Sequence, residues 1–90
     1  MDLREILNQL LWDPEFAGMA HMIQVIYENR GSVNNEESFR LDQVEKVGKK
    51  FLFVNNVPNL DQGMIPLHRI RCVESLPEHR LFYWNYPKDF

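Results

Sequence analysis

The apolar and polar positions at the start of the chain follow the period of a helix. Apolar side chains occupy one side of residues 2–12, namely Leu3, Ile6, Leu7 and Leu10. Asp2 stands where a side chain can cap the free amides of such a helix. Pro14 disfavours helical geometry at Asp13, so the helix ends there, and Asp13 can cap a short second turn through Phe16. We therefore expect an N-terminal helix followed by a tight corner.

The remaining pattern is typical of strands separated by polar turns. In chain order we expect a half-buried strand over residues 21–30, an exposed loop over 32–38, a short strand over 39–41, a capped turn over 42–47, a central strand over 49–54, a loop over 55–63, and strands over 65–73 and 81–86. Lys49 and Lys50 are interpreted as the solvated end of the central strand. The elements predict an α+β fold in which the helix packs on a bent, mostly antiparallel sheet of about five strands, able to curl into a partial barrel.

The large aromatic side chains are expected in the core, because a domain of 90 residues must draw on them for packing. This interpretation covers Trp12, Phe16, Phe82 and Trp84. The alternative is base stacking, since exposed aromatic side chains on a sheet hold unpaired bases in many RNA-binding domains. The sequence leaves the roles of Tyr83 and Tyr86 open.

Composition and charge narrow the class of protein. The chain of 90 residues is 44% hydrophobic and 26% charged, which suits one globular domain over residues 1–90. Its formal net charge of −3 argues against sequence-independent binding along a duplex, because that mode relies on many phosphate contacts. A role with nucleic acid would therefore depend on a few placed cations.

The single cysteine, Cys72, excludes an intrachain disulfide and a cysteine-based zinc cluster. We interpret it as a small core residue of a protein in a reducing compartment. No apolar stretch approaches the ~20 residues of a membrane span, and acidic residues stand where a signal peptide carries positive charge. We expect a soluble, cytoplasmic protein with no membrane segment, metal site or cofactor.

The segment over residues 65–73 carries the most suggestive chemistry, because an imidazole and two guanidiniums interrupt an apolar run. Arg69 and Arg71 offer forks of donors that match a phosphate, and His68 can donate to an anion or exchange a proton with it. Strand alternation places His68 among apolar neighbours, which favours a hydrogen-bonded core histidine between two solvated arginines. Ligand binding by His68 and Arg69 is the alternative. Pro66 lacks a backbone donor and indicates a sheet edge.

Catalysis through His68 has little support in the spacing of the histidines. A pair with His21 or His79 could act as acid and base on a phosphodiester. Phosphoesterases with paired histidines place Ser or Thr two positions after each, whereas this chain has Ile23, Ile70 and Leu81. Metal-ligand spacing and a glycine-rich phosphate loop are also missing from the sequence. We expect a binding module rather than an enzyme.

Several short motifs occur in order along the chain. They are Trp12-Asp13 after the helix, Tyr27 to Gly31 at the end of the first strand, Ile65-Pro66-x-His68-Arg69-Ile70, and a late Trp84. In these motifs the chain resembles the RNA cyclic group end recognition domain family. The resemblance implies a non-catalytic module that recognises RNA termini carrying a cyclic phosphate, with an RNA-processing protein as a further partner. By matching positions, the implied RNA-binding residues are Arg30, His68 and Arg69, supported by Tyr27 and Trp12.

The chemistry of these residues is consistent with that function. A cyclic phosphodiester carries one negative charge, against nearly two for a terminal monophosphate, so one or two cations with a neutral donor can favour the ring form. Arg69 and Arg30 would supply the charge, and His68 would supply a directed donor. Tyr27 or Trp12 would contact the terminal base or ribose.

A protein-interaction adaptor is the alternative function. It would use an exposed strand edge near Pro66 or the aromatic surface of the C-terminal segment. The sequence pI near 5.5 fits an adaptor as well as it fits an RNA-binding protein. A contiguous exposed apolar patch would favour the adaptor, whereas convergence of Arg30, His68 and Arg69 on one concavity would favour RNA.

Overall fold

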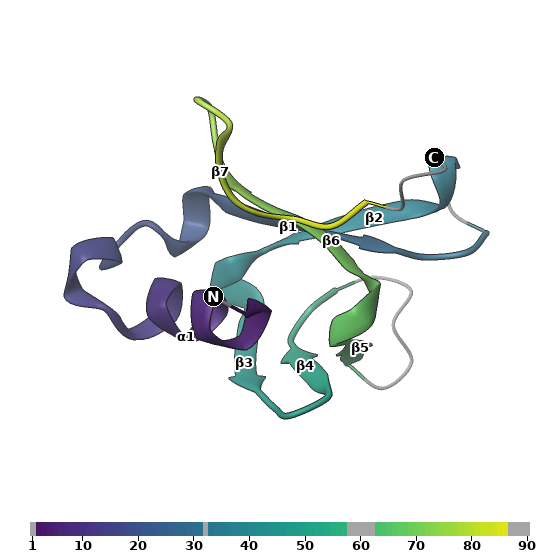
Figure 1. Cartoon of the computed structure of the whole chain (residues 1–90), viewed down its shortest axis with the longest axis horizontal. Coiled ribbons are helices and arrows are strands. Elements are labelled where there is room, and N and C mark those ends of the chain that lie inside the picture. The colour runs from purple at the N-terminus through teal and green to yellow at the C-terminus, as the bar shows by residue number, and fades with distance from the viewer. Residues whose placement is uncertain (1, 32, 58–62, 87–90) are drawn as a thin grey trace.

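One α-helix and two antiparallel sheets make up the regular structure in residues 2–31, 33–57 and 63–86, which the computed structural model describes (Figure 1). The helix is α1 (Leu3–Trp12). The larger sheet has the order β2-β1-β6-β7 and consists of β1 (Ile23–Glu28), β2 (Glu36–Arg40), β6 (Ile70–Ser75) and β7 (Arg80–Trp84). The smaller sheet has the order β3-β4-β5 and consists of β3 (Val44–Val47), β4 (Phe51–Val54) and β5 (Met64–Pro66). The predicted α+β fold is confirmed, with the strands divided between two sheets.

α1 begins and ends as the sequence predicts. The Asp2 side chain accepts a hydrogen bond from the Glu5 amide at 2.9 Å, which caps the first turn. The Asp13 carboxylate accepts one from the Glu15 amide at 2.9 Å and starts the short 3-10 helix η1 (Pro14–Phe16). The buried residues of α1 are Leu3, Leu7 and Leu10. The local signals of capping and helical spacing are therefore sufficient to define this part of the chain.

The core lies between the larger sheet and the layer formed by α1 and the smaller sheet. Figure 1 shows the larger sheet arching over both. β1 buries Ile23, Val25 and Tyr27 on its inner face and turns its other residues to the outer face. Leu7 of α1 and Leu52 of β4 belong to the same buried cluster. Within the described residues, no helix covers the outer face of the larger sheet (Figure 1).

The core prediction is right for two of the large aromatic residues and wrong for two. Phe16 is buried, and the ring of Phe82 packs edge-on against it, with 5.9 Å between the two ring centroids. Trp12 is 72% exposed and Trp84 is 62% exposed. Trp12 follows the last buried leucine of α1 by two positions, which rotates it about 200° away from the buried side. Trp84 pairs with Cys72 on the outer face of the edge strand β7.

The segment over residues 65–73 is not one continuous strand. β5 ends at Pro66, a 3-10 helix, η5 (Leu67–Arg69), follows, and β6 begins at Ile70. The strand is interrupted because the chain leaves the smaller sheet here and joins the larger one. Pro66 lies on an edge strand, as its missing donor predicts. His68 is exposed, so the prediction of a core imidazole is wrong.

β2 begins inside the polar stretch that predicts a loop. Its residues Glu36, Glu37 and Ser38 pair with β1 in antiparallel register. Glu36 to Ser38 have low intrinsic strand propensity, but β1 offers them a free row of backbone donors and acceptors. Tertiary pairing therefore outweighs local preference at this edge of the sheet.

The capped turn predicted over residues 42–47 is replaced by the 3-10 helix η4 (Leu41–Gln43) and then β3. The Gln43 side chain accepts a hydrogen bond from the Arg40 amide at 3.0 Å and donates to the carbonyls of Asn55 and Asn56. These bonds stop the turn early and join it to the end of β4. Of the predicted loop over 55–63, residues 58–62 lie outside the described part of the chain.

Candidate functional site

η5 presents His68 and Arg69 at the junction of the two sheets. The Leu67 amide at its start donates to the Lys50 carbonyl at 2.9 Å, and the Ile70 amide at its end donates to the Leu67 carbonyl. Both site side chains are exposed, and neither has a hydrogen-bond or ion-pair partner among the described residues. The backbone of η5 is thus held in place while its imidazole and guanidinium are available to a ligand.

The Arg71 side chain is bound to the backbone of η5 and does not lie in solvent. The prediction of two solvated arginines is therefore wrong for Arg71. One of its terminal nitrogens, Nη1, donates to the His68 carbonyl at 2.8 Å. The other, Nη2, donates to the Glu28 carboxylate at 2.8 Å, and the Arg71 side chain is only 15% exposed. The two bonds join η5 to the end of β1, because the planar guanidinium can serve both acceptors at once. Arg71 therefore positions His68.

Arg30 lies at the same end of the larger sheet as η5. The last pair between β1 and β6 is Tyr27 with Ile70, and the chain continues from there to Arg30 on one strand and back to η5 on the other. Arg30 is exposed in the turn beyond β1. The structure therefore brings His68 and Arg69 together on one turn and places Arg30 on a separate turn at the same end of the larger sheet.

Tyr27 and Trp12 do not join this group. The Tyr27 side chain is 2% exposed, and its hydroxyl is buried without a hydrogen-bond partner. Burial, followed by the nearby charge of Glu37, raises the pKa of Tyr27. Trp12 is exposed, but it lies about 12 Å along the axis of α1 from Arg4, whose side chain contacts the smaller sheet. The buried Tyr27 ring is therefore closed to a ligand at η5, and Trp12 stands on a separate element.

Residues 1–85 match the family described as MJ1316 RNA cyclic group end recognition domain. The chain belongs to this family. A UPF0248 protein of Methanococcus maripaludis strain C6 is 32% identical over 81 residues, which cover 90% of this chain and 95% of that relative. UPF0248 protein MJ1316 of Methanocaldococcus jannaschii is 28% identical over 81 residues, which cover 90% of each. No solved structure matches the chain.

In this member of the MJ1316 family, η5 has basic neighbours that the sequence does not reveal. Lys49 and Lys50 lie in the turn between β3 and β4, and both are exposed. The Lys50 carbonyl accepts the hydrogen bond that begins η5, so this turn and the site are in direct contact. Two adjacent lysines are visible in the sequence, but their position beside His68 follows only from the pairing of β4 with β5.

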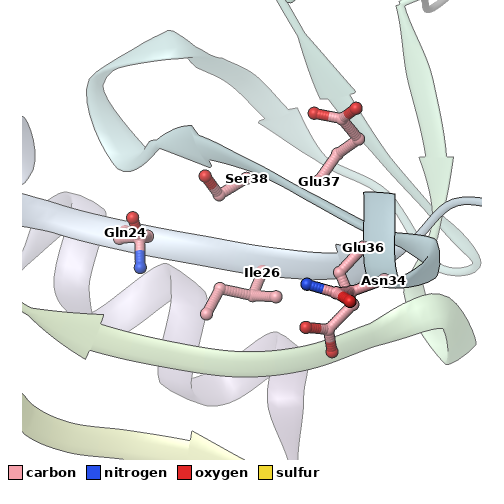
Figure 2. A pocket seen from close by; sticks show the side chains of 6 residues that line it. All are labelled: Gln24, Ile26, Asn34, Glu36, Glu37 and Ser38. Atoms are coloured by element: carbon pink, nitrogen blue, oxygen red, sulfur yellow. The ribbon is translucent and has the colours of Figure 1, made fainter. Parts of the chain in front are cut away.

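The outer face of the larger sheet has the opposite character. A hollow of about 270 Å³ there is lined by Gln24, Ile26, Asn34, Glu36, Glu37 and Ser38 (Figure 2). Figure 2 shows the carboxylates of Glu36 and Glu37 on opposite sides of β2, in keeping with strand alternation. Glu36 faces outward with Glu28 and Glu74. Such carboxylates repel a phosphate, and Glu28, which stands at the η5 end of this face in the MJ1316-family domain, is ion-paired with Arg71.

Two titratable groups report the acidic surroundings of this outer face. Burial, together with the charges of Glu74 and Glu36, raises the pKa of the Cys72 thiol to about 11. Burial also raises the pKa of Tyr86 to about 12, with a hydrogen bond to Glu36 as a further cause. The Cys72 thiol is therefore protonated at neutral pH and is a poor nucleophile there.

Over residues 2–31, 33–57 and 63–86, no group of three or more His, Cys, Asp or Glu side chains is arranged to hold a metal ion. In this described part of the chain, no helix is both long enough and apolar enough to cross a bilayer.

Proposed function

We propose that this protein is a non-catalytic RNA-binding module that holds RNA termini carrying a cyclic phosphate at η5. The observation that carries the proposal is the pair of exposed cation-capable side chains, His68 and Arg69, on a turn whose backbone is held by Lys50 and Arg71. The description of the MJ1316 family supports the same class of ligand. A small fixed turn suits an RNA end better than a continuous tract, because it offers few contacts at one point.

The charge at η5 suits a cyclic phosphate. Arg69 offers a planar fork of donors for two oxygens of the phosphodiester, and His68 offers one directed donor. A terminal monophosphate carries nearly two charges and would need more cations to offset its loss of hydration. Arg30, on a separate turn at the same end of the larger sheet, is the third candidate donor. The site thus favours the ring form through limited, rather than maximal, positive charge.

The positions of the other histidines support binding rather than catalysis. His79 follows β6, where it lies 3.3 Å from the Glu74 carboxylate. His21 precedes β1 in the 3-10 helix η2 (Ala20–Met22). Both stand at the end of the sheet where Ile23 pairs with Ser75, whereas η5 stands at the other end. Acid and base catalysis on one phosphodiester needs both groups within hydrogen-bond reach of it.

The titration of isotope-labelled protein with three matched short RNAs tests this proposal by nuclear magnetic resonance. The RNAs share one sequence and end in a cyclic phosphate, an open phosphate or a free hydroxyl. We expect the largest amide shifts at His68, Arg69 and Arg71, and the tightest binding for the cyclic terminus. The variant Arg69→Ala should bind these RNAs more weakly than the wild type, with little loss of fold. Equal affinity for the three termini, or for wild type and Arg69→Ala, would contradict the proposal.

A protein-interaction adaptor is the second candidate, and the exposed side chains of β7 favour it. Leu81 is 52% exposed and Trp84 is 62% exposed on this edge strand. Exposed apolar groups on an edge are suited to pairing with a strand of another protein. An RNA-processing protein in the cytoplasm would be a fitting partner. In the same titration, a lack of shifts at η5 with every RNA would favour this candidate.

A further inference from the structure

The turn between β3 and β4 is a tight hairpin that displays two lysines. The Gly48 amide donates to the Phe51 carbonyl at 2.9 Å, which closes the turn around Lys49 and Lys50. Gly48 lies close to its surroundings, since a side-chain carbon there would meet the Phe51 carbonyl at 3.0 Å. Both lysines are exposed. Their ammonium groups are carried on a backbone that the hairpin holds in place.

This hairpin is docked directly against η5. Phe51 pairs with Pro66 across β4 and β5, and the Lys50 carbonyl accepts from the Leu67 amide at 2.9 Å. Lys50 therefore stands beside Leu67, the residue next to His68, at the spacing of adjacent strands, about 4.8 Å. The lysine hairpin and η5 are thus joined through their backbones, although they are far apart in the sequence.

Arg4 extends the same surface from α1. Its side-chain Nε donates to the Gly48 carbonyl at 3.0 Å, which holds the guanidinium against the hairpin. Its terminal nitrogens have no hydrogen-bond partner among the described residues. Three separate parts of the chain, at residues 4, 49–50 and 68–69, thus contribute basic side chains to one strip.

We propose that Lys49, Lys50 and Arg4 bind the phosphodiesters that precede the RNA terminus held at η5. This inference rests on the proposed function and names the second part of the same ligand, a single-stranded RNA backbone. Lysine suits that task, since its ammonium is a point charge on a flexible stem and needs no fixed phosphate geometry. Affinity should therefore rise with the length of the RNA and be largely independent of its sequence.

Affinity measured against RNA length tests the inference. We would compare a mononucleotide with a cyclic phosphate and a tetranucleotide with the same terminus, using the wild type and the double variant Lys49→Ala/Lys50→Ala. The double variant should bind the tetranucleotide about tenfold more weakly and the mononucleotide within about twofold of the wild type. Loss of two phosphate contacts should also lower the slope of log affinity against log salt by about 1.4 between ~50 and ~200 mM.

The matched control is Arg40→Ala/Arg80→Ala, which removes two positive charges elsewhere. Arg40 pairs with Gln24 and Arg80 pairs with Ser75, so both lie at the end of the larger sheet opposite η5. This control should bind both RNAs within about twofold of the wild type, since its charges lie off the strip. An equal loss of tetranucleotide affinity in both double variants would overturn the inference.

The remaining outcomes separate this inference from the function on which it rests. If the mononucleotide binds but the tetranucleotide binds no tighter, the proposed contacts of Lys49, Lys50 and Arg4 with RNA are contradicted, whereas end recognition at η5 is supported. If the mononucleotide does not bind and the tetranucleotide binds regardless of its terminus, end recognition is wrong. In that case, weaker binding of the tetranucleotide by Lys49→Ala/Lys50→Ala would mean that the strip binds the RNA backbone without recognising its terminus.

Discussion

The strip formed by residues 4, 49–50 and 68–69 carries basic side chains, whereas the outer face of the larger sheet carries carboxylates. On the strip, His68 and Arg69 are exposed and have no partners among the described residues. The carboxylate of Glu28, which lies nearby, is bound by Arg71 at 2.8 Å, so its charge is offset. What remains at this surface is uncompensated positive charge.

The outer face keeps its carboxylates and adds exposed apolar surface. Burial, followed by the charges of Glu74 and Glu36, raises the pKa of the Cys72 thiol, and the rings of Trp84 and Tyr86 lie 4.4 Å apart between their centroids. The formal net charge of −3 is a sum over the whole chain and describes neither region. A net negative protein can therefore carry a phosphate site, because a ligand senses the charges within about one Debye length rather than the total.

Charge reversal should give the largest difference between the regions. Arg69→Glu is expected to weaken binding of an RNA with a cyclic phosphate terminus by tenfold or more, about 1.4 kcal/mol, since it replaces a charge-assisted donor with a repelling carboxylate. Arg80→Glu makes the same charge change at the far end of β6, where Arg80 pairs with Ser75. Fluorescence anisotropy with labelled RNA measures both. Comparable losses of RNA affinity in Arg69→Glu and Arg80→Glu would show that the two regions do not differ in RNA binding.

Replacement of Arg71 should have the next largest effect. Arg71→Lys keeps the charge but cannot donate to the His68 carbonyl and the Glu28 carboxylate with one planar fork. We expect RNA affinity to fall about threefold to fivefold, with shifted amide resonances at His68 and Arg69 in the free protein. Urea unfolding should show a loss of about 1 kcal/mol, because the ion pair is partly exposed. Unchanged amide resonances and affinity would contradict the positioning role of Arg71.

A smaller effect is expected at the aromatic surface. Trp84→Ala should change RNA affinity by less than about twofold, because Trp84 pairs with Cys72 on the outer face of the larger sheet and packs against Tyr86. The same anisotropy titration measures it, with Arg69→Ala as the comparison. A loss as large as that of Arg69→Ala would place the RNA on the outer face, through base stacking on Trp84.

The smallest expected effect is the pH dependence of stability that Cys72 contributes. Its thiol has a pKa of about 11 in the folded protein, above the ordinary value of 9.0. The folded state therefore holds its proton more tightly than the unfolded state, so this contribution is present below pH 9 and is lost as the pH rises toward 11. Thermal melts over this range should decline less steeply for Cys72→Ala than for wild type. Parallel declines would show that the thiol does not contribute.

Much of this protein follows from the sequence, where the signal lies within a few residues. Asp2 caps α1, Asp13 caps the turn that follows, and β1 has the half-buried alternation that the sequence predicts. The motifs from Trp12 to Trp84 are sufficient to indicate the family. Side-chain chemistry and the resemblance both point to His68 and Arg69, since an imidazole and a guanidinium in an apolar run are unusual.

Only the tertiary structure decided how these parts meet. Trp12 and Trp84 are exposed because neither position faces the buried layer, which depends on the packing of α1 and β7. Arg71 lies 43 residues from Glu28 in the chain, so no local pattern could show that it supports η5 rather than facing solvent. The pairing of Phe51 with Pro66 likewise places the lysine hairpin beside His68. Capping and periodicity depend on near neighbours, whereas sheet partners are chosen by the burial of the whole core.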